Sequence, residues 1–586
     1  MCGISGIIFK EHCTDFTQAR LELEHMKSSQ HLRGPDSSGE FNDTKVFLAH
    51  NRLSILDLSP AGNQPMQNED WVIVFNGEIY NYVELRDELI GLGETFIGSS
   101  DTEVLLTCIS RFGIQEALQK INGIFSFCAY NKYTKEVHLV RDRLGEKPLF
   151  YYVDENSTLY FSSNPSAIVN SLPQVDWHLD YEGLWEYFVL GGIFSDKTLF
   201  KGINRLDSAS VLSYVNNEIT ISKYWTPVFQ PNLTDSDLDS LIREAITSRT
   251  VSDVPIVLFL SGGVDSSAVA AVLKDTDAVH LISDEVDSAR KVAEKFKMRF
   301  KVVQPASLDI SETLFKYSEF SGEATMAGFI PYVTSKAISG EYKVAISANG
   351  ADELFFGYLR IPTPKIKNEF FDKLSKRRNI NINRRSSQPD GQIAEIFRHP
   401  DNFSIPLSGK VSSMADLLRL IELELKDFNQ NEDFPQSSKY RWLELMTYVK
   451  GDLNNTLDFA SMANSLEVRA PFLDYRLVEA ALSLDETRHI NIKNGRKHFL
   501  KKILDSEGVD ESIWNRDKLG FSLISSYFNS IESIKDLAVK ELKREGFLSI
   551  SCTKGNLGRD LQYLRSSALG FLAWKKAWID NGKVKK

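Results

Sequence analysis

The second residue of this chain is a cysteine, and its position suits nucleophilic chemistry. Cys2 directly follows Met1, so removal of Met1 would leave a thiol and a free α-amine on the same residue. An α-amine titrates at roughly 7.7–8.0 and can act as the base that activates its own thiol. A cysteine at residue 2 is usually incidental, so Cys2 is a candidate nucleophile that needs support from residues elsewhere in the chain.

A glycine-containing loop is the second place where chemistry is expected. The loop SGGVDSS, residues 261–267, follows the apolar run Ile256 to Leu260 and opens a helix expected over Ser266 to Lys274. Paired glycines let backbone N–H groups converge, and a helix N-terminus adds positive potential, so the loop can hold an anion. It has neither the ending of a Walker A loop nor the glycine spacing of a dinucleotide fingerprint.

The elements that must position Cys2 are short strands. Five apolar, β-rich runs occupy Ile4 to Phe9, Val46 to His50, Trp71 to Phe75, Ile124 to Tyr130 and Val137 to Arg141. Turn residues separate them at 33–36 and at Asn76-Gly77, and helical patterns intervene at Val83 to Ile90 and Thr102 to Phe112. This alternation predicts an α+β domain with antiparallel sheets over residues 1–215.

The pattern changes after the segment Phe229 to Ser236, which is typical of a linker that runs into a helix N-cap. We predict a linker over residues 216–235 and a second domain over residues 236–586. The strand–loop–helix order around the glycine loop is typical of a parallel α/β domain. Beyond about residue 410 the pattern is mostly helical.

Composition limits the classes to which the chain can belong. Its 586 residues carry 68 basic and 79 acidic side chains, a formal net charge of −11. This acidic balance argues against a nucleic-acid partner, and the sequence has no run of about 18 apolar residues that would span a membrane. The five cysteines are too scattered for a disulfide framework or a zinc site. With no signal-peptide pattern, we expect a cytoplasmic protein of roughly two to four domains.

Several segments of the first half resemble the class II, or N-terminal nucleophile, glutamine amidotransferases. The matching segments are MCGISG (1–6), RGPD (33–36), LAHNRLSI (48–55), NGEIYN (76–81) and SDTE (100–103). The resemblance implies that Cys2 attacks the side-chain amide of glutamine, which gives a tetrahedral oxyanion and then a thioester. It assigns the oxyanion hole to the Asn76 side chain and the Gly77 N–H, although Gly77 could also serve a hairpin turn that needs a positive φ.

The resemblance also implies how glutamine is held. Arg52 would bind the α-carboxylate through two parallel hydrogen bonds, and Asp101 would pair with the α-ammonium group. The implied glutamine-binding residues are Arg52, Leu53, Ser54, Ile55, Asn76, Gly77, Glu78 and Asp101.

The glycine loop resembles the pyrophosphate loop of the ATP pyrophosphatases, which cleave ATP between its α and β phosphates. Further matching segments follow in order at 284–285, 289–293, 347–355, 461–474, 495–498 and 516–521. The ATP-binding residues that the resemblance implies are Leu260, Ser261, Gly262, Gly263, Asp265, Ser266, Ser267, Ile282, Ser347 and Ala348.

Charged residues of these segments suit the chemistry of ATP cleavage. Asp265, Asp352 and Glu353 could hold Mg²⁺ on the ATP phosphates, because this hard ion prefers carboxylate and phosphate oxygen. Lys497 could neutralise the charge that develops on departing pyrophosphate and is the implied catalytic residue here. The Asp352-Glu353 pair could instead be part of a structural salt bridge.

A class II glutaminase followed by an ATP pyrophosphatase domain resembles the asparagine synthetase family, and the resemblance covers nearly the whole chain. It implies a four-layer αββα N-terminal domain followed by a parallel-sheet domain with extra helices. In that family ATP adenylates a carboxylate with release of pyrophosphate, and ammonia from glutamine crosses an internal tunnel and displaces AMP. The resemblance implies a carbon–nitrogen ligase that converts aspartate to asparagine with glutamine, ATP and Mg²⁺. A homodimer is expected from the family alone.

The identity of the amidated acid is less well specified than the chemistry. Asn349 stands where the family pattern has glutamate, Phe459 where it has a basic residue, and Met326 where many relatives have aspartate. These departures favour an alternative in which another carboxylate, such as a sugar acid or a natural-product intermediate, is amidated. An intact Cys2 argues against a β-lactam-forming relative, which would need no ammonia. A non-catalytic descendant is a third hypothesis.

One basic segment has no assigned role. Residues 364–388 contain eight lysines and arginines: Lys365, Lys367, Lys373, Lys376, Arg377, Arg378, Arg384 and Arg385. Such a run could contact phosphates or a partner, but a solvated loop or an outer helix face is the simpler interpretation.

Overall fold

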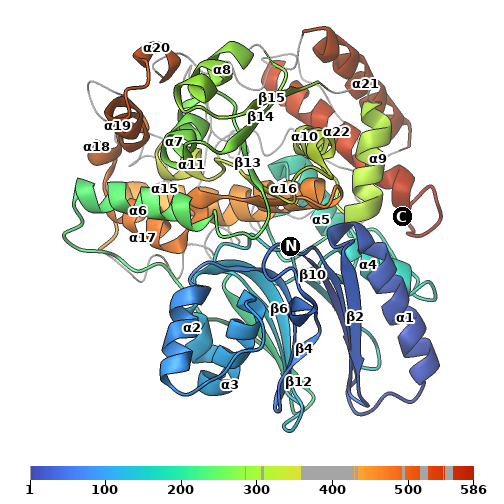
Figure 1. Cartoon of the computed structure of the whole chain (residues 1–586). Helices are drawn as coiled ribbons and strands as arrows, with labels where there is room; N and C mark the ends of the chain where they lie inside the picture. Colours follow the sequence, from blue (N-terminus) through green and yellow to red (C-terminus); the bar gives the residue numbers. More distant parts are fainter. Residues whose placement is uncertain are drawn as a thin grey trace.

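Three β-sheets organise the chain, two in its first half and one in its second (Figure 1). The structure is a computed structural model. It describes residues 2–283, 285–304, 309–357, 428, 433–490, 495–514, 525–545, 547 and 558–586. The basic segment 364–388 and the motif at 516–521 lie outside the described residues. Within the described residues, no helix is both long enough and apolar enough to cross a membrane.

The first half contains two six-stranded sheets in which every described pairing is antiparallel. In spatial order the first sheet is β10 (Asn204–Arg205), β8 (Phe150–Val153), β9 (Leu159–Ser162), β1 (Cys2–Ile8), β3 (Val46–Arg52) and β2 (Ser37–Asn42). The second is β12 (Glu218–Lys223), β11 (Ser210–Val215), β7 (Val137–Arg141), β6 (Gly123–Asn131), β5 (Trp71–Ile79) and β4 (Met66–Gln67).

Helices cover the outer faces of these two sheets and complete four layers. The helices of this half are α1 (Phe16–Ser29), α2 (Tyr82–Gly91), α3 (Asp101–Lys120), α4 (Pro165–Ser171) and α5 (Tyr181–Leu190), with short 3₁₀ turns at His31–Arg33 and Pro60–Gly62. Helix α1 packs on β1 and β3, α3 packs on β5, and β1 faces β5 (Figure 1). Strand β1 is buried along its whole length because both of its faces are covered. The expected αββα architecture is confirmed.

The prediction that Asn76 and Gly77 form a turn is wrong. Both residues lie inside the long strand β5, where Asn76 pairs with Ser126 and Gly77 pairs with Phe125 on β6. Gly77 is not among the glycines with a positive φ. A Cβ at Gly77 would lie 2.0 Å from the carbonyl oxygen of Ile124. Glycine is therefore required here for close backbone approach, not for turn geometry.

Replacing Gly77 with alanine is expected to destabilise the protein. The added methyl group must displace the backbone of β6, which costs about 1–3 kcal/mol for an overpacked site. Gly91→Ala is the matched control, because a Cβ at Gly91 meets no atom within 4 Å. Chemical denaturation of both variants measures the difference. Equal unfolding midpoints for the two would contradict the close-approach explanation.

The second half is built on a five-stranded parallel sheet, as expected from the strand–loop–helix order. In spatial order its strands are β15 (Phe300–Val303), β14 (Asp277–Leu281), β13 (Ile256–Phe259), β16 (Val344–Ile346) and β17 (Glu467–Arg469). Strand β13 is central, and the glycine loop follows it directly. Parallel strands align their carboxyl ends at one edge of the sheet, where ligands bind in open α/β folds.

Many helices surround this sheet. Those that precede β17 are α6 (Asp235–Ser248), α7 (Val264–Leu273), α8 (Val286–Lys295), α9 (Ile310–Ser321), α10 (Phe329–Ile338), α11 (Ala351–Leu354), α15 (Gln436–Glu444), a π-helix (Leu445–Leu453) and α16 (Asn454–Met462). After it come a 3₁₀ turn (Pro471–Leu473), α17 (Tyr475–Ser483), α18 (Glu486–His489), α19 (His498–Ser506), α20 (Glu511–Trp514), α21 (Ser525–Arg544) and α22 (Gly558–Trp578). Helix α6 begins with a capping box between Thr234 and Asp237.

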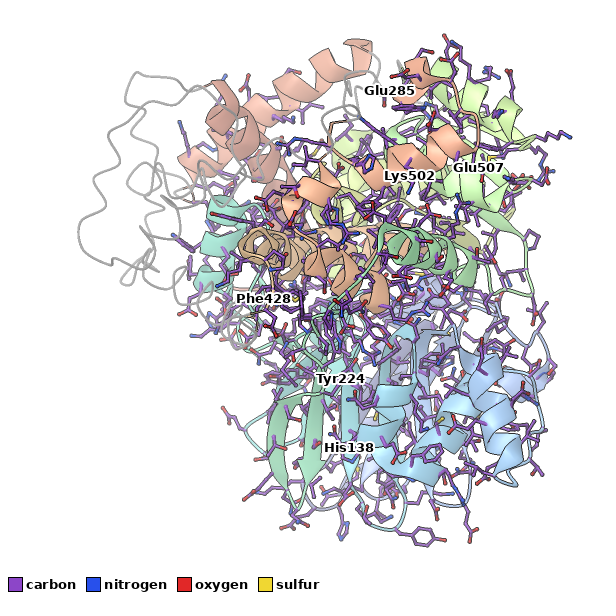
Figure 2. The ribbon with its side chains drawn as sticks, turned by 90° about the vertical axis from the view of Figure 1, so that its left-hand side faces the viewer. His138, Tyr224, Glu285, Phe428, Lys502 and Glu507 are labelled. Carbon is purple, nitrogen blue, oxygen red and sulfur yellow. The ribbon has the colours of Figure 1, made fainter. Side chains whose placement is uncertain are left out.

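Ordered sheet structure extends past the predicted start of the linker. The predicted linker over residues 216–235 begins with β12, which pairs along its length with β11, so that part of the prediction is corrected. The hydroxyl of Tyr224 donates to the carbonyl oxygen of Arg141 (3.1 Å), near the boundary between the halves (Figure 2). The next residue, Trp225, lies against Trp442 of the second half, with ring centroids 6.0 Å apart. The other domain limits stay predictions.

Candidate active sites

The structure brings Cys2 together with residues that are distant in the sequence. Cys2 begins β1 and pairs with Arg52 on β3 of the same sheet. Across the sandwich, the Oδ1 atom of Asn76 on β5 accepts a hydrogen bond from the backbone N–H of Cys2 (2.9 Å). Cys2 is buried. Burial raises the pKa of its thiol, while a backbone hydrogen bond from Leu53 and the charge of Arg52 oppose that shift. The predicted nucleophile therefore lies on the first sheet at a point where that sheet contacts the second.

The guanidinium of Arg52 organises the loop that follows β3. Its nitrogens donate to the carbonyl oxygens of Leu56 (3.2 Å) and Ser59 (2.9 Å) and to the side chain of Asn63 (2.9 Å). The predicted glutamine-binding residues Leu53, Ser54 and Ile55 lie on this loop. The buried side chains of Leu53 and Ile55 pack against Val344 and Met462 of the second half, and the Ser54 N–H donates to Asp36 (2.7 Å).

Two buried carboxylates, those of Glu78 and Asp101, belong to the predicted glutamine site. Glu78 follows Asn76 and Gly77 on β5, and Asp101 begins α3 and accepts a hydrogen bond from the Ile79 N–H (2.9 Å). Burial raises the pKa of Asp101 to about 6 and raises the pKa of Glu78 well above its usual value. The Oε2 atom of Glu78 has no hydrogen-bond partner among the described residues. An ammonium group would satisfy this buried acceptor.

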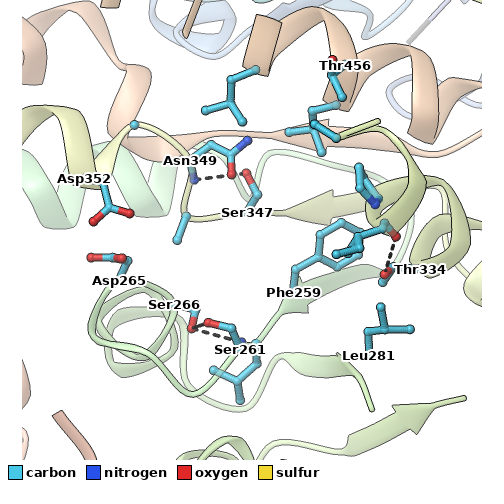
Figure 3. Close-up of a pocket in the computed structure, with 18 of the residues that line it drawn as sticks. Phe259, Ser261, Asp265, Ser266, Leu281, Thr334, Ser347, Asn349, Asp352 and Thr456 are labelled. Carbon is cyan, nitrogen blue, oxygen red and sulfur yellow. Dashed lines mark hydrogen bonds between the residues drawn. The ribbon is translucent and has the colours of Figure 1, made fainter. Parts of the chain in front are cut away.

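A cavity of about 340 Å³ lies at the carboxyl ends of β13, β14 and β16 (Figure 3). Eight of the predicted ATP-binding and metal-binding residues line it: Leu260, Ser261, Asp265, Ser266, Ser347, Ala348, Asp352 and Glu353. The other predicted ATP-binding residues, Gly262, Gly263, Ser267 and Ile282, are not on its wall. The structure thus gathers segments separated by nearly a hundred residues around one space.

The glycine loop has the geometry expected of an anion-binding turn. Gly262 has a φ of +79°, and a Cβ there would lie 2.6 Å from the backbone nitrogen of Ala289, so only glycine fits. The Ser261 N–H donates to the Ser266 hydroxyl (3.1 Å), and the two hydroxyls lie 2.9 Å apart. Helix α7 begins directly after Gly263. Its N-terminus and these hydroxyls can hold phosphate oxygens.

Lys497 lies between two acidic side chains of the cavity. Its Nζ atom is 2.6 Å from Asp265 Oδ2 and also pairs with Asp352, and Figure 3 shows the two carboxylates directed toward the same space. Burial alone would lower the pKa of Lys497, but the two carboxylates raise it above its usual value. Lys497 has a φ of +60°, a backbone conformation that non-glycine residues rarely adopt.

The acidic residues of the cavity fit a magnesium–phosphate complex better than a metal site made of protein alone. No group of three or more His, Cys, Asp or Glu in the described part of the chain is arranged to hold a metal ion. Mg²⁺ usually takes one or two carboxylates and completes its shell with phosphate oxygens and water. Asp265 and Asp352 could supply these carboxylates, and Glu353 lies on the same wall.

The three departures from the family pattern lie in different places. Asn349 is on the cavity wall. Phe459 is fully buried and stacks on Phe150 of the first half, with ring centroids 6.2 Å apart. Met326 does not line the cavity, although its neighbour Ala327 does. Of these three residues, Asn349 alone lines the cavity, and the part that each plays in the choice of acid stays a prediction.

Most of the cavity wall was not predicted from the sequence. The additional lining residues are Phe259, Val279, His280, Leu281, Ala327, Ile330, Pro331, Thr334, Gly350, Leu453, Thr456 and Leu457. Phe259 ends β13 and Leu281 ends β14, so their positions at the carboxyl ends of apolar strands could have indicated them. The residues from α10 and α16 carry no comparable signal, since helix packing alone brings them to the wall.

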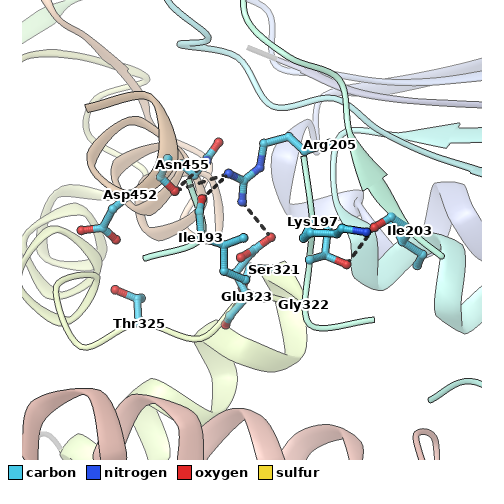
Figure 4. A network of polar contacts seen from close by, with 12 residues as sticks. Ile193, Lys197, Ile203, Arg205, Ser321, Gly322, Glu323, Thr325, Asp452 and Asn455 are labelled. Carbon is cyan, nitrogen blue, oxygen red and sulfur yellow. Dashed lines mark hydrogen bonds and ion pairs between the residues drawn. The ribbon is translucent and has the colours of Figure 1, made fainter. Parts of the chain in front are cut away.

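Buried ion pairs join the two halves of the chain. Arg33 donates to the backbone oxygen of Cys2 (2.9 Å) and to Asp458 (2.8 Å). Arg205 contacts Glu323 (3.4 Å) in a polar network shown in Figure 4. A third pair joins Arg469 to Glu78 (3.2 Å). In each pair the arginine and its carboxylate come from opposite halves of the chain.

The network in Figure 4 reaches the cavity through a hydroxyl group. The Thr456 hydroxyl, on the cavity wall, donates to Asp452 (3.1 Å) at the end of the π-helix. Burial raises the pKa of Asp452 to about 6 and also raises the pKa of Glu323, which Arg205 partly opposes. π-Helical segments are rare and occur often at functional sites.

Comparison with known families agrees with this two-site architecture. A model described as a glutamine amidotransferase domain matches residues 1–225, and one described as asparagine synthase matches residues 237–574. The chain belongs to the asparagine synthase family. Its first half is therefore a glutamine amidotransferase domain, and the family implies the use of ATP by the second.

Proteins with similar sequences align with nearly all of the chain. "Asparagine synthetase [glutamine-hydrolyzing] 1" of Bacillus subtilis is 31% identical over 557 residues, which cover 89% of this chain and 87% of the relative. "Amidase chyE" of Penicillium rubens is 30% identical over 662 residues, 94% of each chain. These levels of identity do not specify the acid that this family member amidates.

The pKa of Asp101 leads to an expected pH dependence of glutamine hydrolysis. A raised pKa keeps the carboxyl neutral at low pH, so its ionised form, which can bind an ammonium group, is gained as pH rises through about 6. We expect kcat/KM for glutamine to rise over that range in the wild type. Asp101→Asn should lower kcat/KM and remove this step from the profile. Glu116→Gln, at an exposed position of α3, is the control; an unchanged step in Asp101→Asn would contradict the assignment.

Proposed function

We propose that the chain hydrolyses glutamine at Cys2 and uses the ammonia to amidate a carboxylate that ATP has activated in the cavity beside Lys497. This is the reaction of a carbon–nitrogen ligase that forms AMP and pyrophosphate. The observation that carries the proposal is the presence, in one chain, of a buried cysteine site and a separate cavity with an anion-binding loop and a lysine between two carboxylates.

The residues of the first site can divide the work of glutamine hydrolysis. The Cys2 thiolate attacks the amide carbon, and the Asn76 side chain and the Gly77 N–H stabilise the oxyanion that forms. Arg52 binds the α-carboxylate of the substrate. Glu78 and Asp101 bind its α-ammonium group, consistent with the unpartnered oxygen on Glu78.

The residues of the second site can hold ATP and stabilise its departing pyrophosphate. Ser261, Ser266 and the N-terminus of α7 contact phosphate oxygens. Lys497 neutralises negative charge as the bond between the α and β phosphates breaks. Asp265 and Asp352, with Glu353 on the same wall, would hold Mg²⁺, which supplies further charge neutralisation when bound.

Aspartate is the first candidate for the amidated acid, and the product would then be asparagine. A second candidate is another carboxylate, such as a sugar acid or a natural-product intermediate. Asn349 on the cavity wall supports the second candidate, as does similarity over 94% of each chain to a relative named as an amidase.

An acid panel separates these candidates. Purified protein is incubated with ATP, Mg²⁺, glutamine and one acid at a time, and glutamate, AMP and pyrophosphate are measured. Aspartate-dependent AMP with formation of asparagine supports the first candidate, and AMP that depends on another acid supports the second. Asp265→Asn should lose AMP formation and keep glutamate release. A wild-type protein that releases neither glutamate nor AMP would favour a non-catalytic descendant.

A further inference from the structure

Strand β17 carries Arg469, which contacts a residue of the cavity wall and a residue of the Cys2 site. Arg469 ends this strand and lies opposite Ile346 on β16. The carbonyl oxygen of Arg469 accepts a hydrogen bond from the N–H of Ser347 (2.9 Å), and Ser347 lines the cavity. The backbone of Arg469 is thus part of the structure that shapes the second site.

The side chain of Arg469 contacts residues of both halves of the chain. One terminal nitrogen is 3.2 Å from Glu78 Oε1, and Nε contacts Glu467. The other terminal nitrogen donates to the carbonyl oxygens of Arg249 (2.8 Å) and Val251 (2.6 Å). The residue is fully buried. Hydrogen bonds hold two of its three nitrogens, and the third, Nη2, forms the ion pair with Glu78 without a hydrogen bond. The guanidinium therefore has little freedom to rotate, so a shift of its backbone would be transmitted to Glu78.

Nearby charges act on the buried carboxylate of Glu78 in opposite directions. The negative charges of Asp101 and Glu467 oppose its ionisation, and Arg469 is the charge that favours it most strongly. Its second oxygen has no hydrogen-bond partner among the described residues and lies on the strand that also carries Asn76. If Arg469 holds Oε1 of Glu78 in place, Oε2 remains available to accept a hydrogen bond from a ligand.

We propose that Arg469 is a positioning residue that holds Glu78 for the ammonium group of glutamine and makes glutamine affinity depend on the occupancy of the cavity. Filling the cavity displaces Ser347, the hydrogen bond between strands displaces Arg469, and the ion pair with Glu78 changes in consequence. By linkage, bound glutamine alters affinity in the cavity by the same factor. The inference rests on the proposed function, because it takes glutamine as the ligand of Glu78.

The first test compares Arg469→Gln with the wild type in glutamine hydrolysis without nucleotide. KM for glutamine is expected to rise by about 5–150-fold, the range typical of coupled sites, with little change in kcat. AMP formation supported by added ammonia should be retained. The KM of Arg469→Lys should lie between those of the wild type and Arg469→Gln. Lysine keeps the positive charge but lacks the planar guanidinium that donates several hydrogen bonds in a fixed geometry. Lys585→Gln, which removes an exposed ion pair with Asp176 that also joins distant parts of the chain, is the control.

The second test starts from the wild-type protein and uses a variant only for comparison. KM for glutamine is measured on the wild type with and without a non-hydrolysable ATP analogue, and then on Arg469→Lys. A change in the wild type that is reduced in the lysine variant supports the proposal. An unchanged KM in the wild type overturns the dependence on the cavity, and a parallel loss of KM, kcat and ammonia-supported activity in Arg469→Gln overturns the positioning role. A wild type that hydrolyses no glutamine overturns the proposed function itself.

Discussion

Replacing Cys2 with alanine is expected to abolish glutamine-dependent amidation while leaving amidation from added ammonia intact. Cys2 carries the thiol that we propose as the nucleophile, and loss of a nucleophile lowers kcat by about 10³-fold or more. The cavity with Lys497 lies in the other half and does not contact Cys2 in the described hydrogen bonds. Glutamate release and AMP formation are measured separately, with glutamine or ammonium chloride as nitrogen source.

Cys13→Ala is a matched control for this experiment. Cys13 has the same exposed fraction as Cys2, 7%, but belongs to the hydrophobic core and has no part in either site. The control should keep both activities. If Cys2→Ala lost the ammonia-supported reaction as well, the division of labour between the two halves would be wrong.

Replacing Lys497 with alanine is expected to produce the opposite pattern. Asp265 and Asp352 would face the ATP phosphates without the cation that lies between them. We expect a loss of AMP formation on the order of 10²–10³-fold, as when one preorganised charge or donor is removed from a transition state. The loss should appear with glutamine and with ammonia alike, because both nitrogen sources need the activated acid.

Glutamate release reports whether the Lys497→Ala protein is folded. It should persist, since the Cys2 site does not contain Lys497. Lys502→Ala is the matched control: Lys502 lies on the same helix, α19, and is exposed (Figure 2). Unchanged AMP formation in Lys497→Ala, or an equal loss in Lys502→Ala, would refute the catalytic role of Lys497.

Local patterns in the sequence predicted several of the strands and helices. The run Val137 to Arg141 coincides with β7, and the segment Thr102 to Phe112 falls within α3. These predictions succeed because the spacing of apolar residues and the residues that form turns can be recognised within a few positions of the sequence. The turn assigned to Asn76 and Gly77 failed because the need for glycine comes from the carbonyl oxygen of Ile124, on a neighbouring strand.

The structure brings several predicted site residues together, but the residues that surround them were not predicted. Motifs named Cys2, Asp265 and Lys497, and the structure brings Lys497 to Asp265 across more than two hundred residues. No local pattern shows that Phe459 stacks on Phe150 or that Thr456 reaches the cavity wall. Those placements follow from how helices pack against the sheet and against the first half, and a sequence pattern of a few residues does not encode such contacts.

The arginine–carboxylate pairs that cross between the halves limit how such an enzyme can be recombined. A hybrid that joins the first half of this chain to the second half of another family member keeps a pair intact only where that member carries the matching residue. An unmatched buried charge costs about 3–5 kcal/mol, and there are several such contacts, at Arg33–Asp458, Arg205–Glu323 and Arg469–Glu78. Exchange of acid specificity is therefore better attempted by grafting cavity residues than by swapping whole modules.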